Sequence, residues 1–170
     1  MQNSKTFLLV VLGILAAFGP FVTDMYLPGL PAMTAYFGTT ASMVQLGITT
    51  AMLGLAFGQI IVGPLSDKYG RRKPLLLSLG VFFFSTIGCI FSWNVEVFIF
   101  FRFLQGMAGA GGIVISRSVA TDKFSGKELA KMLAVIGAIN GVAPVAAPVI
   151  GGLVTGTIGW KGIFVILLFI

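Results

Sequence analysis

Charged residues are scarce in this sequence of 170 residues, and histidine and cysteine are almost missing. Only 9% of the residues are Asp, Glu, Lys or Arg and 57% are hydrophobic, whereas a soluble domain carries about 25% charged residues. So few charges cannot cover a globular surface, which excludes a free-standing soluble protein. With no histidine and one cysteine, Cys89, we expect no disulfide framework, no His/Cys metal site and no cofactor. The sequence predicts an all-α integral membrane protein.

Long uncharged runs indicate where the chain can cross a membrane, since a spanning helix needs about 20 mostly apolar residues. The run from 25 to 66 is too long for one span, and its polar, glycine-containing stretch near 36–42 predicts a turn. Prolines at Pro20, Pro28 and Pro31 predict kinks in the first helix. We therefore predict one incomplete six-helix bundle over residues 1–170. Its expected spans are 6–35, 42–63, 74–92, 95–117, 130–154 and a truncated segment 160–170.

The placement of lysine and arginine predicts the topology. Nine of the eleven fall on one side of the expected spans, and the side richer in Lys and Arg is normally cytoplasmic. The N-terminus is therefore expected in the cytoplasm. Because these residues lie in short loops between spans, the net charge of +6 indicates topology and no nucleic-acid partner. The nine are Lys5, Lys68, Arg71, Arg72, Lys73, Arg117, Lys123, Lys127 and Lys131.

Two ionisable residues fall inside expected spans, where a charge is costly and commonly marks function. Asp24 lies about 18 residues into the first helix, and Arg102 lies about 7 residues below the outer end of the fourth. Both depths are in the outer half of the bilayer, so the two side chains could share a cavity. Arginine stays protonated, so only the carboxylate can exchange a proton. We predict that Asp24 and Arg102 couple transport to protons; the alternative is a fixed ion pair that only stabilises the fold.

The fourth helix has one face of polar and small residues. Arg102, Gln105, Gly106 and Gly109 recur at three- and four-residue steps, followed by Ile113 and Ser116, so they share one side of a helix. We expect that side to line a cavity. The cavity-lining candidates are Tyr26, Gln105, Gly106, Gly109 and Asn140. Small residues also recur four apart, which lets helix backbones approach closely in a membrane. These pairs are Gly54/Gly58, Gly106/Ala110 and Gly137/Gly141.

The loop between the second and third expected helices carries a recognisable motif. The pattern Gly63-x-x-x-Asp67-Lys68-x-Gly70-Arg71-Arg72 resembles the helix 2–3 loop signature of the major facilitator superfamily at every defining position. Its glycines permit a tight turn. Asp67 can interact with the positive N-terminal end of the next helix or with a neighbouring arginine. The pattern Arg102-x-x-Gln105-Gly106 resembles the helix 4 motif of the proton-coupled members.

Further segments resemble a drug-exporting branch of that superfamily. The pattern Ala143-x-x-x-Ala147-Pro148-x-x-Gly151-Gly152 is similar to the drug antiporter motif, with alanine at two positions where glycine is usual. The segment 24–31 resembles the first helix of the bicyclomycin/chloramphenicol-resistance (Bcr/CflA) group. Trp160-x-x-Ile163-Phe164 resembles the start of that group's sixth helix.

The resemblance implies two six-helix halves with the substrate site between them. This chain would supply the N-terminal half, as five helices plus the start of a sixth. The implied function is proton-coupled multidrug efflux by alternating access across the bacterial cytoplasmic (inner) membrane, performed by a transporter and not an enzyme. The implied partners are a small-molecule drug, protons, membrane lipid and the missing C-terminal half. Asp67 and Arg71 would help to hold the cytoplasmic gate closed against that half.

Two other functions remain open on the sequence alone. A proton-coupled importer of a small metabolite would share the helix 2–3 loop but not usually the antiporter motif. A non-transporting membrane subunit, or an inactive truncated remnant, would have no second half to move against.

Overall fold

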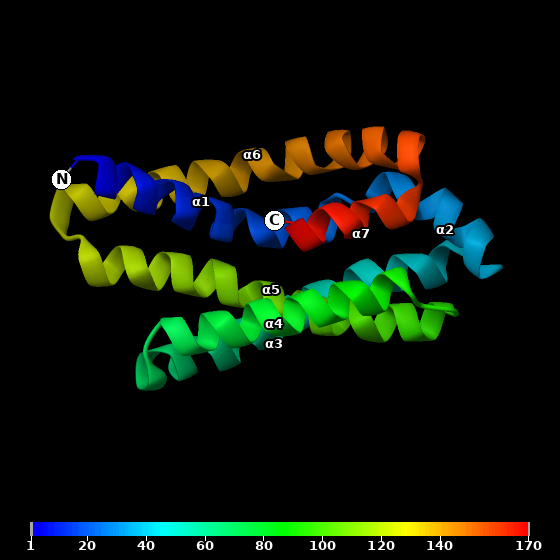
Figure 1. Ribbon diagram of the computed structural model, residues 1–170, viewed down its shortest axis with the longest axis horizontal. Helices are drawn as coiled ribbons and strands as arrows, with labels where there is room; N and C mark the ends of the chain where they lie inside the picture. Colours follow the sequence, from blue (N-terminus) through cyan, green and yellow to red (C-terminus); the bar gives the residue numbers. More distant parts are fainter. Residues whose placement is uncertain (1, 170) are drawn as a thin grey trace.

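The computed structural model describes the backbone of residues 2–169 and the side chains of residues 6–169, and within that range every long element is a helix (Figure 1). Five segments there are long and apolar enough to cross a membrane. The predicted all-α membrane fold is therefore confirmed. In chain order the elements are α1 (Gln2–Asp24), η1 (Leu27–Gly29), α2 (Leu30–Phe37), α3 (Ala41–Tyr69), α4 (Arg72–Ile90), α5 (Val95–Lys123), α6 (Gly126–Ile158) and α7 (Trp160–Phe169).

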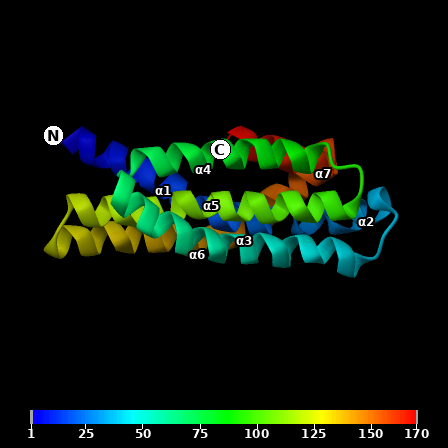
Figure 2. The ribbon, with the colours of Figure 1, turned by 90° about the horizontal axis from the view of Figure 1, so that it is seen from below.

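The long helices run along one axis, and their connections alternate between the two ends of the bundle (Figure 1, Figure 2). The α3–α4 and α5–α6 turns lie at the same end as the N-terminus, on the left of both views. The α2–α3, α4–α5 and α6–α7 connections lie at the opposite end. Most of the lysines and arginines predicted on the cytoplasmic side lie in or beside the α3–α4 and α5–α6 turns. We therefore call that end of the bundle the basic end.

The first span is broken near its middle. The helix α1 continues through Pro20 and ends at Asp24, after which a turn and η1 lead into α2. Pro28 lies within η1 and Pro31 in the first turn of α2, and proline there cannot donate the backbone hydrogen bond that would extend α1. The predicted kink near these two prolines is confirmed, and its consequence is that Asp24 stands at a helix end.

The helix α5 is the centre of the bundle and packs against α1, α3, α4 and α6. Small residues make this possible: a Cβ on Gly106 would lie 2.0 Å from the Ala51 carbonyl oxygen, and one on Gly54 would lie 2.1 Å from that of Phe103. The predicted close packing is confirmed for these positions. Gly137 and Gly141 on α6 differ, since nothing in the described part of the chain lies within 4 Å of a Cβ there.

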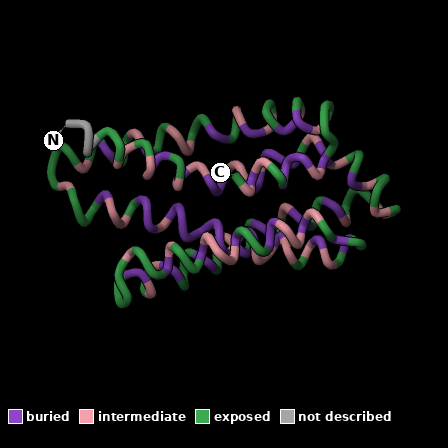
Figure 3. The backbone as a smooth tube through the Cα atoms, in the orientation of Figure 1, coloured by how far each residue is buried: buried purple, intermediate pink, exposed green. Residues whose placement is uncertain are grey.

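Burial follows this arrangement (Figure 3). Of the apolar window that defines each span, 61% of residues are buried in α5 but only 17% in α6. The helix α6 touches α1, η1 and α7 along one side and exposes Val142, Val145, Val149 and Leu153 on another. The bundle therefore has a closed centre and an open apolar flank.

Three helices are longer than predicted. The helix α3 extends to Tyr69 and α5 to Lys123, and α6 begins at Gly126 and ends at Ile158. The prediction followed the apolar length that a bilayer requires, about 20 residues, and a helix does not end where its apolar run ends. The extra turns of α3 and α5 at the basic end place Asp67 and Asp122 beside Arg71.

Candidate functional site

Arg102 is completely buried between α1, α3 and α5, with 0% of its surface exposed. Its Nη2 donates to the Val22 carbonyl at 2.7 Å, its Nε to the Gly47 carbonyl at 3.4 Å, and its Nη1 to Gln105 Oε1 at 2.7 Å. Val22 is in the last turn of α1, where carbonyls lack their usual helical donors. The break in the first span therefore supplies the guanidinium with an acceptor.

Aromatic rings and a second polar layer complete the surroundings of Arg102. The Arg102 Cζ lies 4.6 Å from the centre of the Tyr26 ring and 5.8 Å from that of Phe164, and ring faces attract cations. Gln105 is oriented in turn, because its Nε2 donates to Thr86 Oγ1 at 2.8 Å. Among the described residues, no carboxylate pairs with Arg102. The buried charge is thus stabilised by carbonyl dipoles, an amide and rings.

Asp24 lies in a different environment. It lines an open pocket of about 290 Å³ between α1, α3, α5 and α6. Within the described range, no hydrogen bond or ion pair joins its carboxylate to another residue. The other polar side chains of this pocket are Thr23, Gln59, Arg117 and Asn140.

Asp24 is the last residue of α1, and the guanidinium of Arg102, from α5, contacts α1 nearby. The two charges nevertheless lie in separate environments. The acceptor Val22 is two residues before Asp24, which agrees with the similar depths predicted for the two charges. No ion pair forms between them in the described range, so the fixed-pair alternative does not describe this structure. Arg102 is not among the residues that line the Asp24 pocket.

Of the cavity-lining candidates, Asn140 lines the Asp24 pocket. The structure places the other four in the packed interior instead. Tyr26 covers Arg102 and donates to the Val44 carbonyl at 2.7 Å, while Gln105 binds Arg102 and Gly106 packs on α3. Gly109 faces Val22, with 3.9 Å from a Cβ to the nearest side-chain atom. That face of α5 packs against α1 and α3. It lines the pocket only at Ile113 and Arg117, one and two helical turns after Gly109.

Three polar pocket residues are not among the site residues predicted from the sequence: Thr23, Gln59 and Arg117. The sequence counts Arg117, at the end of the expected span 95–117, only among the basic residues that set the topology. It lies one helical turn after Ile113, which also lines the pocket, and residues four apart share a helix face. Gln59 lies on α3 in an otherwise apolar stretch. A single amide in that stretch forms no pattern that would mark it as a pocket residue.

The helix 2–3 loop forms a charge cluster at the basic end. Arg71 donates through Nε to Asp122 Oδ2 at 2.8 Å and through Nη2 to Oδ1 at 3.1 Å. Its Nη1 donates to Ser66 Oγ at 2.7 Å and also contacts Asp67. Hydrogen bonds from Asp122 and Asp67 raise the pKa of Arg71, so the guanidinium stays charged. Of the two partners predicted for Asp67, the structure shows the neighbouring arginine, Arg71. Asp122 is a second partner of Arg71 that lies outside the motif.

The remaining motif positions of this loop are simpler. Gly70 has φ +81°, which an L side chain rarely adopts, so glycine is required for the turn. Gly63 has nothing within 4 Å of a Cβ among the described residues. Lys68 lies 5.3 Å from the centre of the Tyr69 ring, and Arg72 is the exposed first residue of α4.

The α6 motif packs on the break in the first span. A Cβ on Gly151 would lie 1.8 Å from the Met25 carbonyl oxygen, and one on Gly152 would lie 3.9 Å from the Pro28 ring. Ala147 is completely buried and Ala143 is 4% exposed, so alanine is accommodated where the motif usually has glycine. Pro148 lies inside α6 without ending it. The motif therefore holds α6 directly beside Asp24.

Comparisons with known proteins identify the family of this chain. The sequence model of the Major Facilitator Superfamily matches residues 11–170. The chain is 43% identical over 162 residues to the uncharacterized MFS-type transporter YdgK of Bacillus subtilis, covering 94% of this chain and 40% of that protein. It is 34% identical over 167 residues to a bicyclomycin resistance protein homolog of Haemophilus influenzae, covering 98% and 42%.

A third relative is the chloramphenicol resistance protein of Pseudomonas aeruginosa, which is 36% identical over 146 residues, covering 85% of this chain and 35% of that protein. The chain thus spans about two fifths of the length of these curated relatives. The two resistance proteins support the predicted Bcr/CflA type. With the helical fold and the matched motifs, these findings show that the chain belongs to the Major Facilitator Superfamily of membrane transporters.

Proposed function

We propose that this chain is the N-terminal part of a proton-coupled drug exporter in a bacterial cytoplasmic membrane, with Asp24 as the group that exchanges the proton. The observation that carries the proposal is the Asp24 carboxylate, which faces an open pocket without a partner in the described range. A carboxylate held in an ion pair could not change protonation as freely. The two relatives named for drug resistance support the direction of transport.

The pocket also suits a small drug. Its volume of about 290 Å³ is close to the lower limit of about 300 Å³ for ligand pockets, and a second half of the transporter would enlarge it. Its lining combines the carboxylate and Arg117 with amides and with Met52, Leu55 and Ile113. Such a mixture of apolar surface and few polar groups is typical of small-molecule pockets.

In the proposed cycle, protonation of Asp24 from the outer side neutralises the carboxylate and favours release of the drug. Deprotonation toward the cytoplasm then allows the next drug molecule to bind. Arg102, whose Nη2 donates to the Val22 carbonyl two residues before Asp24, is the second residue that we propose for proton coupling. One proton moving through 150 mV supplies about 3.5 kcal/mol, which sustains a drug gradient of about 300-fold.

The cluster of Arg71, Asp67 and Asp122 has a proposed role at the other end of the cycle. We expect the basic end to face the cytoplasm, as the lysine and arginine bias predicts. There the cluster would hold the inner side closed against the second half while Asp24 is open to the outside.

The test uses the complete natural protein in proteoliposomes with an imposed proton gradient and chloramphenicol as the drug. We expect Asp24→Asn to reduce uphill efflux to the level of protein-free vesicles, because the amide cannot exchange a proton. Glu96→Gln is the matched control, since Glu96 is an exposed acid in the first turn of α5 and should transport as the wild type does.

Two results would contradict the proposal. Uphill efflux at the wild-type rate in Asp24→Asn would show that another group couples the proton. Drug and protons moving in the same direction in the wild type would instead indicate an importer.

A further inference from the structure

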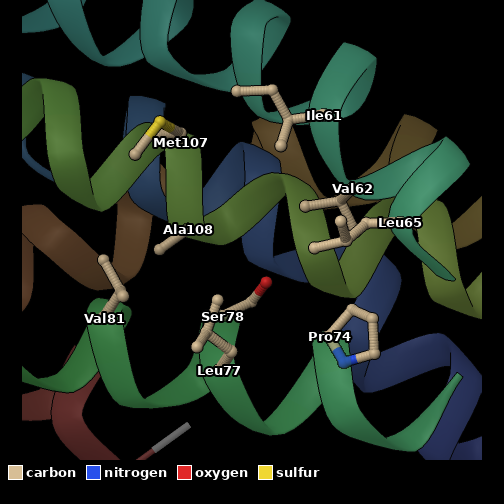
Figure 4. Close-up of a pocket in the computed structure, with 9 residues that line it drawn as sticks. All are labelled: Ile61, Val62, Leu65, Pro74, Leu77, Ser78, Val81, Met107 and Ala108. Carbon is tan, nitrogen blue, oxygen red and sulfur yellow. The ribbon is translucent and has the colours of Figure 1, made fainter. Parts of the chain in front are cut away.

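An apolar groove lies between α3 and α4 and shares no residue with the Asp24 pocket. Ile61 and Leu65 of α3 face Pro74 and Val81 of α4, and Ala108 of α5 lies beneath them (Figure 4). The groove has a volume of about 120 Å³. This is below the volume of about 300 Å³ that is typical of pockets for drug-sized ligands, so a larger molecule would lie only partly inside it.

Close packing on α5 explains why the groove exists. The helix α3 touches α5 at Gly54 and Gly58, where a Cβ would lie about 2 Å from carbonyl oxygens of α5. The helix α4 touches α5 at Gly111, where a Cβ would lie 2.3 Å from Ser78 Oγ. Both helices are therefore held to α5 by small residues, and the space between them is left to be filled from outside the bundle.

The groove continues to the basic end. A second hollow of about 130 Å³ shares Leu65, Pro74 and Leu77 with the first and extends to Tyr69 and Lys73. Lys68 and Arg72, beside it in sequence, are exposed. No acidic residue lines either hollow, so this end of the groove is electrically positive.

Ser78 adds a polar group partway along the groove. Its side chain is only 5% exposed and points to the groove in Figure 4. Within the described range it makes no hydrogen bond. Since no fully buried side-chain oxygen there lacks a partner, the Ser78 hydroxyl is reachable from the groove. An unused hydroxyl at that position can donate to a ligand.

The order of these groups matches one class of molecule. From the basic end inward come the Lys73 ammonium, the Ser78 hydroxyl and the apolar wall at Val81. Lys73 and Ser78 are five residues apart, about 7.5 Å along the axis of α4 and about 140° around it, and they line the two adjoining hollows separately. A phospholipid has its anionic phosphate, its ester carbonyls and its acyl chains in the same order.

We propose that the groove between α3 and α4 binds one anionic phospholipid of the surrounding membrane. The phosphate pairs with Lys73, an ester carbonyl accepts a hydrogen bond from Ser78, and one acyl chain lies between α3 and α4 toward Val81. The N-terminal end of α4 supports the phosphate position, because its first turn contains no acidic residue and its N-cap side chain makes no capping hydrogen bond.

The test measures lipid binding to the complete natural protein by native mass spectrometry, with palmitoyl-oleoyl phosphatidylglycerol or phosphatidylcholine added in detergent. We expect the wild type to bind the first phosphatidylglycerol more tightly. Lys73→Gln should weaken that binding about fivefold, since a lysine near an anionic headgroup contributes about 1 kcal/mol, and leave phosphatidylcholine unchanged. Lys127→Gln, another exposed lysine of the basic end, should behave as the wild type.

A second pair of variants tests the acyl chain. Val81→Phe fills the groove and should weaken binding of both lipids, whereas Val145→Phe, on the exposed side of α6, should not. Both variants are compared only as folded monomers in the spectrum. Equal losses in Lys73→Gln and Lys127→Gln would indicate general surface attraction, and wild-type binding in Val81→Phe would place the acyl chain elsewhere. Either result overturns the proposal.

Discussion

Arg102 and Asp24 are two charges that lie near the same end of α1, and their surroundings are opposite. Arg102 is completely buried and all three of its nitrogens have acceptors. Asp24 faces an open pocket, and no described residue binds its carboxylate. A charge whose nitrogens all have acceptors fixes the structure around it, whereas a carboxylate without a described partner is available to a ligand. The difference separates a structural charge from a candidate for chemistry.

Removing Arg102 should have the largest effect on stability. In Arg102→Ala the Gln105 amide and the Val22 carbonyl lose a charged donor inside the bundle, and hydrogen bonds to charged groups contribute about 1.5–3 kcal/mol each. We expect a loss of about 3 kcal/mol or more, measured as a lower thermal midpoint of the complete protein in detergent. Arg102→Lys should lose less stability, because the lysine ammonium keeps the charge and can still donate to some of the three acceptors of Arg102. An unchanged midpoint in Arg102→Ala would remove the distinction between the two charges.

The close packing around Arg102 gives a second, smaller effect. Gly106→Val places a Cβ 2.0 Å from the Ala51 carbonyl oxygen, so α3 and α5 must separate, at a cost of about 2 kcal/mol. Gly80→Val on α4 is the matched control, because nothing in the described part of the chain lies within 4 Å of a Cβ there. Equal thermal midpoints for the two variants would mean that α5 is less tightly held than the structure indicates.

Asp24→Asn should have the smallest effect on stability. Its carboxylate has no partner in the described range to lose, so the thermal midpoint should correspond to a change within about 0.5 kcal/mol. The same variant is expected to abolish uphill efflux, and the combination of intact stability with lost coupling would sharpen the comparison. A large loss of stability in Asp24→Asn would instead give Asp24 a structural role.

Much of the fold could be predicted because apolar length, proline and small-residue spacing are local properties of the sequence. The break near Pro28 and the close packing at Gly54 and Gly106 are examples. The ends of α3 and α5 could not be predicted in the same way, since their last turns are polar and lie beyond the apolar run.

The site was less predictable for a physical reason. Arg102 is held by the carbonyls of Val22 and Gly47, and any residue supplies a carbonyl, so no side-chain pattern marks these partners. Asp122 binds Arg71 across 51 positions of sequence, and a surface acid at a helix end gives no signal of its own. Asn140 was found because an amide in an apolar helix stands out, whereas Arg117 was hidden among the loop charges.

The backbone on either side of Asp24 is fixed at two points. Val22 accepts from Arg102 at 2.7 Å, and the Met25 carbonyl is in such close contact with Gly151 that no side chain fits between them. These two contacts hold the main chain on both sides of Asp24 in place. If Asp24 exchanges a proton as proposed, the effect would therefore be a change in the charge that the pocket presents, felt by a drug or by a helix of the second half that enters it.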